Sequence, residues 1–200
     1  MRSLLGKIGT QDVEDVHHFV QLALENETVK LDRTRIALFG GSHGGFITAH
    51  LLGQKPDFYV AGAMRNPVID VAAMLATTDI PDWTASESGL SVLDPLIPTS
   101  EIYQKLYDVS PIKHVQGSTC ILPLSLIYFS AAIKAPVLLL LGEEDKRVPP
   151  SQGLLLANCI RHLSPKVNLY PGEGHALGGI ETETDVYLST VEFFDRVFKK

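Results

Sequence analysis

The stretch 35-RIALFGGSHGGFITAH-50 decides the fold of this chain. Its beginning, residues 35–40, is a short apolar run that ends in glycine, which is typical of a buried strand in a parallel sheet. Residues 44–54 have the apolar spacing of a helix. Between the two, residues 40–44 are Gly-Gly-Ser-His-Gly, with the spacing G-x-S-x-G. The stretch therefore predicts a strand, a tight turn that carries Ser42, and a helix.

Strands and helices alternate along the rest of the chain. Further apolar runs predict strands at residues 59–68, 135–142 and 166–171. Helical spacing occurs at residues 11–24, 100–107, 151–162 and 183–198. Such alternation predicts βαβ units and a mainly parallel sheet with helices on both faces. The long connection between the second and third strands, residues 70–134, is either functional or foreign to the basic fold.

Composition limits the class of protein. The chain has 200 residues, of which 45% are apolar and 20% charged, so one globular domain is expected. Its net charge is -6 and it has no basic cluster beyond the terminal Lys199-Lys200, which predicts neither a nucleic acid nor a membrane as partner. Cys120 and Cys159 form no CxxC pair, which favours a reducing, cytoplasmic setting without a metal site. The longest apolar run, residues 120–133, is shorter than the roughly 18 to 20 residues that span a bilayer.

A serine nucleophile needs a histidine base that is oriented by a carboxylate. In α/β-hydrolases these residues follow in the order Ser, Asp or Glu, His. Here the third predicted strand ends in an acidic loop that contains Asp145, and the fourth ends in a glycine-flanked loop that contains His175. Because the carboxyl ends of parallel strands lie at one edge of a sheet, we expect Ser42, Asp145 and His175 to meet there.

Each of these residues also has a plainer interpretation. A serine on a tight strand-to-helix turn needs flanking positions that lack a Cβ, which explains the glycines, but Ser42 could also be incidental to a glycine-rich turn. Glu143 and Glu144 compete with Asp145, which we favour because its short side chain lies just before Val148-Pro149, and the whole loop could simply be solvated. His175 could be a capped loop histidine.

Two further residues are candidates for the site. The backbone N–H of His43 is expected to be the first donor of the oxyanion hole. Arg65 follows the second strand and could bind a substrate carboxylate, or else form a structural salt bridge with a nearby acid. The remaining histidines are predicted to be surface or packing residues: His17, His18, His50, His114 and His162.

Four segments carry a family resemblance: GGSHGGF (40–46), RNPVIDVAAMLATTDIPDW (65–83), LLLLGEEDKRVPPSQG (138–153) and YPGEGHAL (170–177). They resemble the catalytic domain of the acylaminoacyl-peptidases (acyl-peptide hydrolases) in the prolyl oligopeptidase family of serine peptidases. The resemblance implies an α/β-hydrolase fold and a Ser42–Asp145–His175 triad. It also implies release of an N-acylated, typically N-acetylated, amino acid from a short peptide, without a metal or organic cofactor.

The chain differs from that family in two ways. The family's catalytic domain begins earlier, with further strands, a loop of the His-Gly-Gly-Pro type that supplies a second oxyanion donor, and a β-propeller domain. No His-Gly-Gly precedes Ser42 here. Residues 116–132 replace what is a short loop in the family. The resemblance therefore implies that residues 1–200 are an N-terminally truncated α/β-hydrolase domain with an insertion at about 116–132.

Three functional classes stay open at this point. The first is a serine peptidase that acts on short N-acylated peptides, which the segments RNPV (65–68) and TDIPDW (78–83) favour. The second is a catalytically inactive fragment that acts as a binding or interaction module, and the third is a general serine esterase. An unpaired sheet edge would also promote self-association of the chain into a homo-oligomer.

Overall fold

The structure, a computed structural model, describes residues 4–26, 28–91, 99–115 and 133–199. Its centre is a four-stranded parallel sheet in the order β1-β2-β3-β4. The strands are β1 (Ala37–Gly41), β2 (Ala61–Arg65), β3 (Val137–Gly142) and β4 (Lys166–Tyr170). The parallel sheet predicted from the alternation of strands and helices is confirmed.

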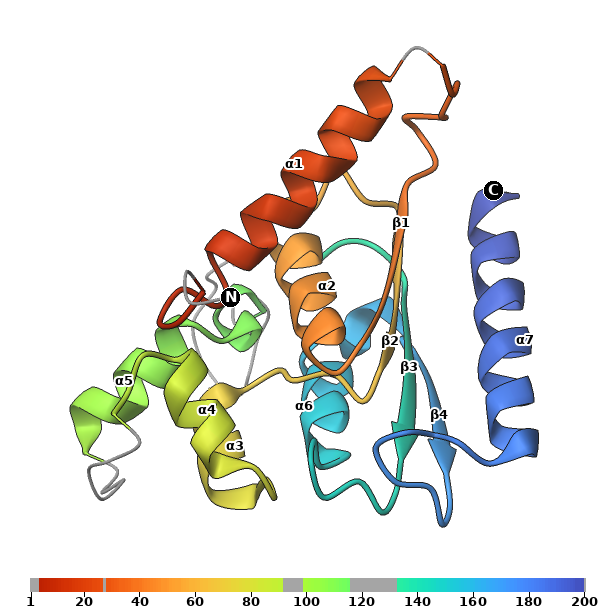
Figure 1. Cartoon of the computed structure of the whole chain (residues 1–200). Helices are drawn as coiled ribbons and strands as arrows, with labels where there is room; N and C mark the ends of the chain where they lie inside the picture. The colour runs from red at the N-terminus through yellow and green to blue at the C-terminus, as the bar shows by residue number, and fades with distance from the viewer. Residues whose placement is uncertain (1–3, 27, 92–98, 116–132, 200) are drawn as a thin grey trace, which may run out of the picture.

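Helices cover both faces of the sheet (Figure 1). One face packs against α1 (Gln11–Glu25), α2 (His43–Gln54) and α6 (Ser151–Cys159), and the other against α7 (Ile180–Phe198). The short helices α3 (Val71–Thr77), α4 (Pro81–Glu87) and α5 (Ser100–Asp108) form a group beside α2, near the carboxyl ends of the strands. Two 3₁₀ turns complete the described chain, η1 (Pro111–His114) and η2 (Arg161–Leu163).

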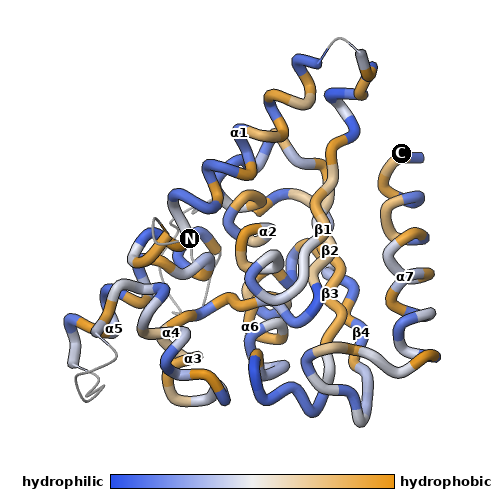
Figure 2. Tube along the Cα trace, viewed as in Figure 1, coloured by the Kyte–Doolittle hydropathy of each residue, from blue (hydrophilic) through white to orange (hydrophobic). Residues whose placement is uncertain are grey.

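The strands are apolar because both faces of the sheet are covered. In β3 every residue is buried. Leu139 and Leu141 pack with α2 and α6, while Leu138 and Leu140 pack toward Val186 of α7. Figure 2 shows apolar residues concentrated along the strands and α2. An unbroken apolar run thus serves two cores at once, which explains why β3 was recognisable in the sequence.

The connection after β2 is structured where it is described. Asp70 caps α3 by accepting hydrogen bonds from the N–H groups of Ala72 (2.9 Å) and Ala73 (3.1 Å). Gln152 of α6 holds the start of this segment, because its Oε1 accepts from the N–H groups of Ile69 and Asp70. The sequence patterns did not predict α3 and α4. The predicted insertion at 116–132 lies outside the described residues.

Along the described parts of the chain, no helix is both long enough and apolar enough to cross a bilayer.

His50 is the most deeply buried histidine of α2. Its ring is fully buried, its Nε2 lies 3.0 Å from the carbonyl oxygen of Val109, and its Nδ1 lies 3.0 Å from Nε2 of Gln54. Because the carbonyl can only accept and the Gln54 amide nitrogen can only donate, the ring is neutral with its proton on Nε2. Burial is the main cause that lowers the pKa of His50 to about 3, and the charges of His114 and Lys113 contribute in the same direction. His50 is therefore a packing residue, as the sequence predicted.

This buried histidine predicts acid sensitivity. In the unfolded chain His50 takes up a proton below about pH 6.5, whereas the folded state resists protonation until about pH 3. Its contribution to stability is therefore complete above pH 6.5 and falls with pH, by about 1.4 kcal/mol per pH unit below that point. We expect urea unfolding between pH 7.5 and pH 4.5 to show a shallower loss of stability in His50→Gln than in the unmodified protein. Equal slopes in both proteins would contradict this.

Candidate active site

Ser42 lies at the turn between β1 and α2 and has an unusual backbone conformation. Its φ is 55° and its ψ is -118°, a region that costs energy for a residue with a Cβ. The turn is held from both sides: the N–H of Ser42 donates to the carbonyl oxygen of Arg65 (2.9 Å), and the carbonyl oxygen of Ser42 accepts from the N–H of Phe46 (3.0 Å). The tight strand-to-helix turn that the sequence predicted is therefore present, and its backbone is strained at Ser42.

The glycines around Ser42 do not have equal roles. A Cβ on Gly40 would lie 2.2 Å from the carbonyl oxygen of Gly44, which no side chain can tolerate. A Cβ on Gly45 would lie 2.7 Å from Cβ of Pro67. By contrast, a Cβ on Gly44 would meet nothing within 4 Å. The prediction that both flanking glycines must lack a Cβ is confirmed for Gly40 and wrong for Gly44, because that position faces open space.

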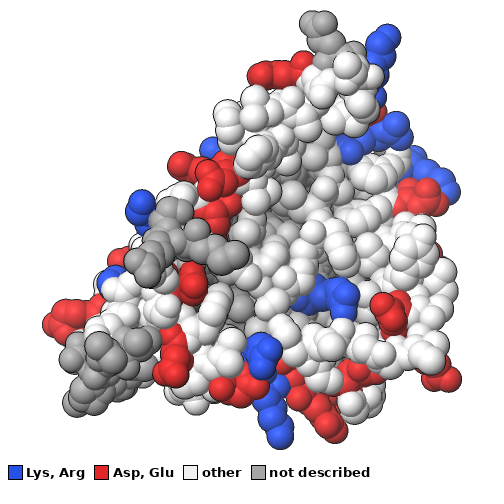
Figure 3. All heavy atoms as spheres, viewed as in Figure 1, with Lys and Arg blue, Asp and Glu red and all other residues white. Residues whose placement is uncertain are grey.

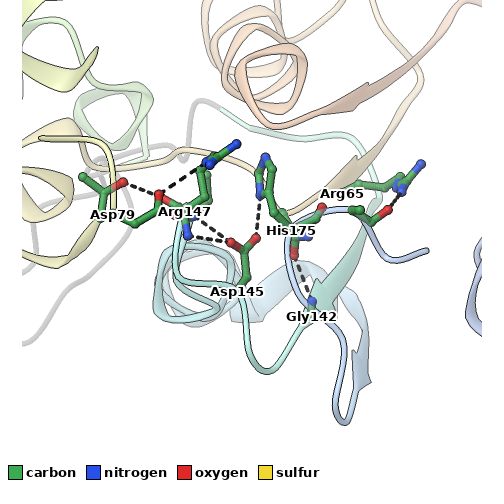
Figure 4. A network of polar contacts seen from close by, with 10 residues as sticks. Arg65, Asp79, Gly142, Asp145, Arg147 and His175 are labelled. Carbon is green, nitrogen blue, oxygen red and sulfur yellow. Dashed lines mark hydrogen bonds and ion pairs between the residues drawn. The ribbon is translucent and has the colours of Figure 1, made fainter. Parts of the chain in front are cut away.

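Asp145 and His175 are joined by a short hydrogen bond. Nδ1 of His175 lies 2.7 Å from Oδ2 of Asp145, whose side chain is completely buried (Figure 4). The second carboxylate oxygen, Oδ1, accepts from the backbone N–H groups of Arg147 and Val148, both at 2.9 Å. This carboxylate is fixed by three donors, so it orients the ring and leaves Nε2 of His175 as the free ring nitrogen.

The structure also separates the three acids of this loop. Asp145 reaches His175, whereas Glu143 and Glu144 are exposed. Within the described parts of the chain, neither Nε2 of His175 nor Oγ of Ser42 has a hydrogen-bond partner. Hydrogen bonds between a nucleophile and its base are often long without substrate and tighten when substrate binds.

The segment TDIPDW (78–83) packs against the acidic loop. The hydroxyl of Thr78 donates to the carbonyl oxygen of Arg147 (2.7 Å), and the N–H of Asp79 donates to that of Lys146 (3.0 Å). The carboxylate of Asp79 also lies 3.3 Å from Nε of Arg147 (Figure 4). This segment therefore supports the loop that carries Asp145, from a part of the chain distant in sequence.

His43, which follows Ser42, lies next to a second aspartate. Its Nε2 lies 2.9 Å from Oδ2 of Asp12, a nearly buried carboxylate in the first turn of α1. The ring stacks on Phe46, with centroids 5.2 Å apart, and meets Trp83 edge-on at 5.9 Å. The backbone of His43 opens α2, where N–H groups lack helical partners. The sequence patterns did not identify Asp12 as part of the site.

Arg65 and Asn66 contact the His175 loop from the end of β2. Arg65 is half-buried, and its guanidinium donates to the carbonyl oxygen of Ala176. The amide of Asn66 donates to the carbonyl oxygen of His175 at 3.0 Å. Among the ion pairs of the described residues Arg65 has none, so its observed partner is a backbone carbonyl and not one of the nearby acids. Sequence analysis did not identify Asn66 as part of the site.

The surface around the site carries both basic and acidic side chains. Figure 3 shows basic and acidic side chains next to one another along the lower edge of the visible face, where the strands end in Figure 1. In the parts of the chain that the structure describes, no three His, Cys, Asp or Glu side chains are grouped so that they could hold a metal ion.

Comparison with known proteins identifies the family and the fold of this chain. The model of the prolyl oligopeptidase family (Peptidase_S9) matches residues 1–200. The acylamino-acid-releasing enzyme of Mus musculus is 41% identical over 94% of this chain, and that of Arabidopsis thaliana is 36% identical over all of it. In both cases the chain covers 24% of the relative. The chain thus spans about a quarter of the length of these curated relatives.

A solved structure agrees with the sequence matches. The uncomplexed acylaminoacyl peptidase of Pyrococcus horikoshii superposes with a TM-score of 0.77 at 25% identity, over 98% of this chain and 29% of that one. The chain therefore belongs to the prolyl oligopeptidase family of serine peptidases and has the α/β-hydrolase fold. The similarity to acylamino-acid-releasing enzymes confirms the resemblance found in the sequence.

Gly40 and Gly44 differ in the space available for a Cβ, so alanine substitutions at the two positions form a matched pair. Gly40→Ala should lower the free energy of unfolding by about 1 to 3 kcal/mol, because the added methyl overlaps the Gly44 carbonyl group. Gly44→Ala should leave it unchanged or raise it by up to about 1 kcal/mol, because alanine favours a helix over glycine. Urea denaturation measures both. Identical midpoints for the two variants would show that the turn has room at both positions.

Proposed function

We propose that this chain carries the triad of a serine peptidase, with Ser42 as nucleophile, His175 as base and Asp145 as the residue that orients the base. The observation that carries the proposal is the 2.7 Å contact between His175 and the buried Asp145, on loops at the same sheet edge as the β1–α2 turn. The strained backbone of Ser42 supports it, because a serine in this conformation stands at a helix N-terminus.

The proposed chemistry follows from these positions. Nε2 of His175 takes the proton of Ser42 Oγ as this oxygen attacks the substrate carbonyl carbon. The resulting imidazolium is stabilised by Asp145 and passes the proton to the leaving amine as the peptide bond breaks. Water, deprotonated by His175, then cleaves the acyl-enzyme ester and the proton returns to Ser42.

The negative oxygen of the tetrahedral intermediate needs hydrogen-bond donors. The backbone N–H of His43 is the proposed first donor, because it lies directly after Ser42 at the first residue of α2. In the family a His-Gly-Gly-Pro loop supplies the second donor, and the present sequence has no His-Gly-Gly before Ser42. Loss of one such donor costs on the order of 10² to 10³ in turnover, so each donor of an oxyanion hole contributes strongly to the rate.

The proposed substrate is a short peptide with an acylated N-terminus. The names of the relatives support this class, because they are acylamino-acid-releasing enzymes. The proposed product is an N-acylated, typically N-acetylated, amino acid, and the proposed setting is cytoplasmic. A general esterase with the same triad, or an inactive binding module, is the outcome to be tested against it.

Covalent labelling with a fluorophosphonate probe tests the triad. We expect labelling of the unmodified chain and none of Ser42→Ala. Asp145→Asn should label more slowly by a factor on the order of 10⁴, because the ring loses its orienting carboxylate. Glu144→Gln is the matched control: it removes an exposed acid one residue earlier and should leave the rate unchanged.

Failure of a folded sample to label would contradict the peptidase proposal and support the binding module. For a sample that labels, hydrolysis of an acetyl-alanine chromogenic amide and of a butyrate ester should be compared. Preference for the amide supports the peptidase, and turnover of the ester alone supports the esterase.

Arg65 is proposed to bind a substrate carboxylate with guanidinium donors that Ala176 does not use. Arg65→Ala should then raise KM about tenfold for acetyl-alanyl-alanine with a free carboxylate, and leave KM unchanged for the same peptide with an amidated C-terminus. Any effect of Arg65→Ala on the His175 loop changes both KM values alike, so the ratio of the two KM values reports only on the substrate carboxylate. An equal change for both peptides would remove Arg65 from the substrate site.

A further inference from the structure

Asn66 is a buried polar residue that the proposed chemistry does not use. It follows the last residue of β2, is only 2% exposed, and has a φ of 41°, in the left-handed region. Its N–H donates to the carbonyl oxygen of Leu140 (3.0 Å), which fixes its backbone to β3. Asparagine is one of the few residues other than glycine that adopt this conformation readily.

The side chain of Asn66 connects the two loops that carry Asp145 and His175. Its Oδ1 accepts from the N–H of Gly142, the last residue of β3, at 2.9 Å. Its Nδ2 donates to the carbonyl oxygen of His175 at 3.0 Å. The Asn66 amide thus binds the beginning of the acidic loop through its oxygen and the backbone of His175 through its nitrogen.

The acidic loop and the His175 loop are in close backbone contact at Gly142. A Cβ on Gly142 would lie 2.6 Å from the carbonyl oxygens of both Glu173 and Gly174, so the loops are in backbone contact there. The N–H of Glu144 also donates to the carbonyl oxygen of Glu173 at 2.9 Å. Because these contacts leave little freedom, the bridge through Asn66 fixes how far the His175 backbone lies from the acidic loop.

We propose that Asn66 is a positioning residue for His175. By holding the carbonyl group of His175 against the end of β3, it sets the hydrogen bond between His175 and Asp145 and the direction of Nε2. This inference rests on the proposed function, since Nε2 is the atom that removes the proton from Ser42. Asn66 itself touches no reacting atom.

An amide is the group that this bridge needs. One of its partners is a donor, the N–H of Gly142, and the other is an acceptor, the carbonyl oxygen of His175. A carboxylate of the same shape keeps the acceptor, loses the donor, and places a negative oxygen against that carbonyl. Asn66→Asp therefore breaks one defined hydrogen bond while it retains the size of the side chain and its tolerance of positive φ.

Asn168 on β4 offers a matched control. Its Nδ2 donates to Oγ of Ser189 at 3.0 Å and lies 3.4 Å from Oδ2 of Asp185, both on α7. Asn168→Asp, like Asn66→Asp, replaces an amide donor by a carboxylate that faces oxygen atoms. In Asn168→Asp these oxygen atoms belong to α7 and not to the His175 loop. Both variants should lose stability in urea denaturation.

The experiment compares kcat and KM for the acetyl-alanine amide in both variants, and records the proton resonance of His175 Nδ1–H by NMR. We expect Asn66→Asp to lower kcat about 10- to 100-fold with KM within twofold, and to shift or broaden that resonance, because a misplaced base costs rate and not binding. Asn168→Asp should leave both kcat and the resonance unchanged.

The readouts separate this inference from the proposed function. If the unmodified chain neither labels nor turns over substrate, the proposed function fails, while the Nδ1–H resonance in Asn66→Asp still tests the positioning role. An unchanged resonance in Asn66→Asp would overturn the inference. So would an equal loss of kcat in both variants, since it would assign the effect to stability alone.

Discussion

The parallel register of the four strands is the constraint on which the site depends. Gly41 pairs with Arg65, Arg65 with Leu140, and Gly142 with Tyr170, so the strands end at neighbouring positions along one edge. Each of these ends is followed within a few residues by a group of the site. Because both faces of β3 are buried, this strand is held between two cores, and the loop that follows it is positioned with it.

Register alone does not orient side chains, and the loops receive support from three directions. Backbone N–H groups of the acidic loop bind Asp145 from within the loop. Thr78 and Asp79 hold the same loop from the group of short helices beyond β2. Residues at the end of β2 hold the histidine loop. The site is therefore a meeting point of segments, each of which would be an ordinary mobile loop without the others.

The sequence predicted the features that depend on local pattern. The apolar run of β3, the turn at Ser42 and the loops with Asp145 and His175 were all recognisable, because strand periodicity and strand order determine them. Asn66 was missed because its partners lie 76 and 109 residues away, and no local pattern encodes such hydrogen bonds. The seven-residue helices α3 and α4 were missed because they are too short for a helical repeat, although Asp70 and Pro81 mark their beginnings. Gly44 was wrongly predicted to need the absence of a Cβ, because it belongs to the G-x-S-x-G motif. The structure shows open space around that position.

The pairing of β2 with β3 has a consequence for how the protein folds. These strands are adjacent in the sheet although the whole segment between Arg65 and Val137 separates them in sequence. Closing so long a loop costs chain entropy before any contact repays it, and parallel pairing of this kind is slow. Until it is complete, the run Val137–Leu141 is exposed as a sticky β-forming segment, and the bridge from Asn66 to Gly142 does not exist. We therefore expect aggregation during refolding and late formation of the site to have the same origin, a single long-range strand pairing.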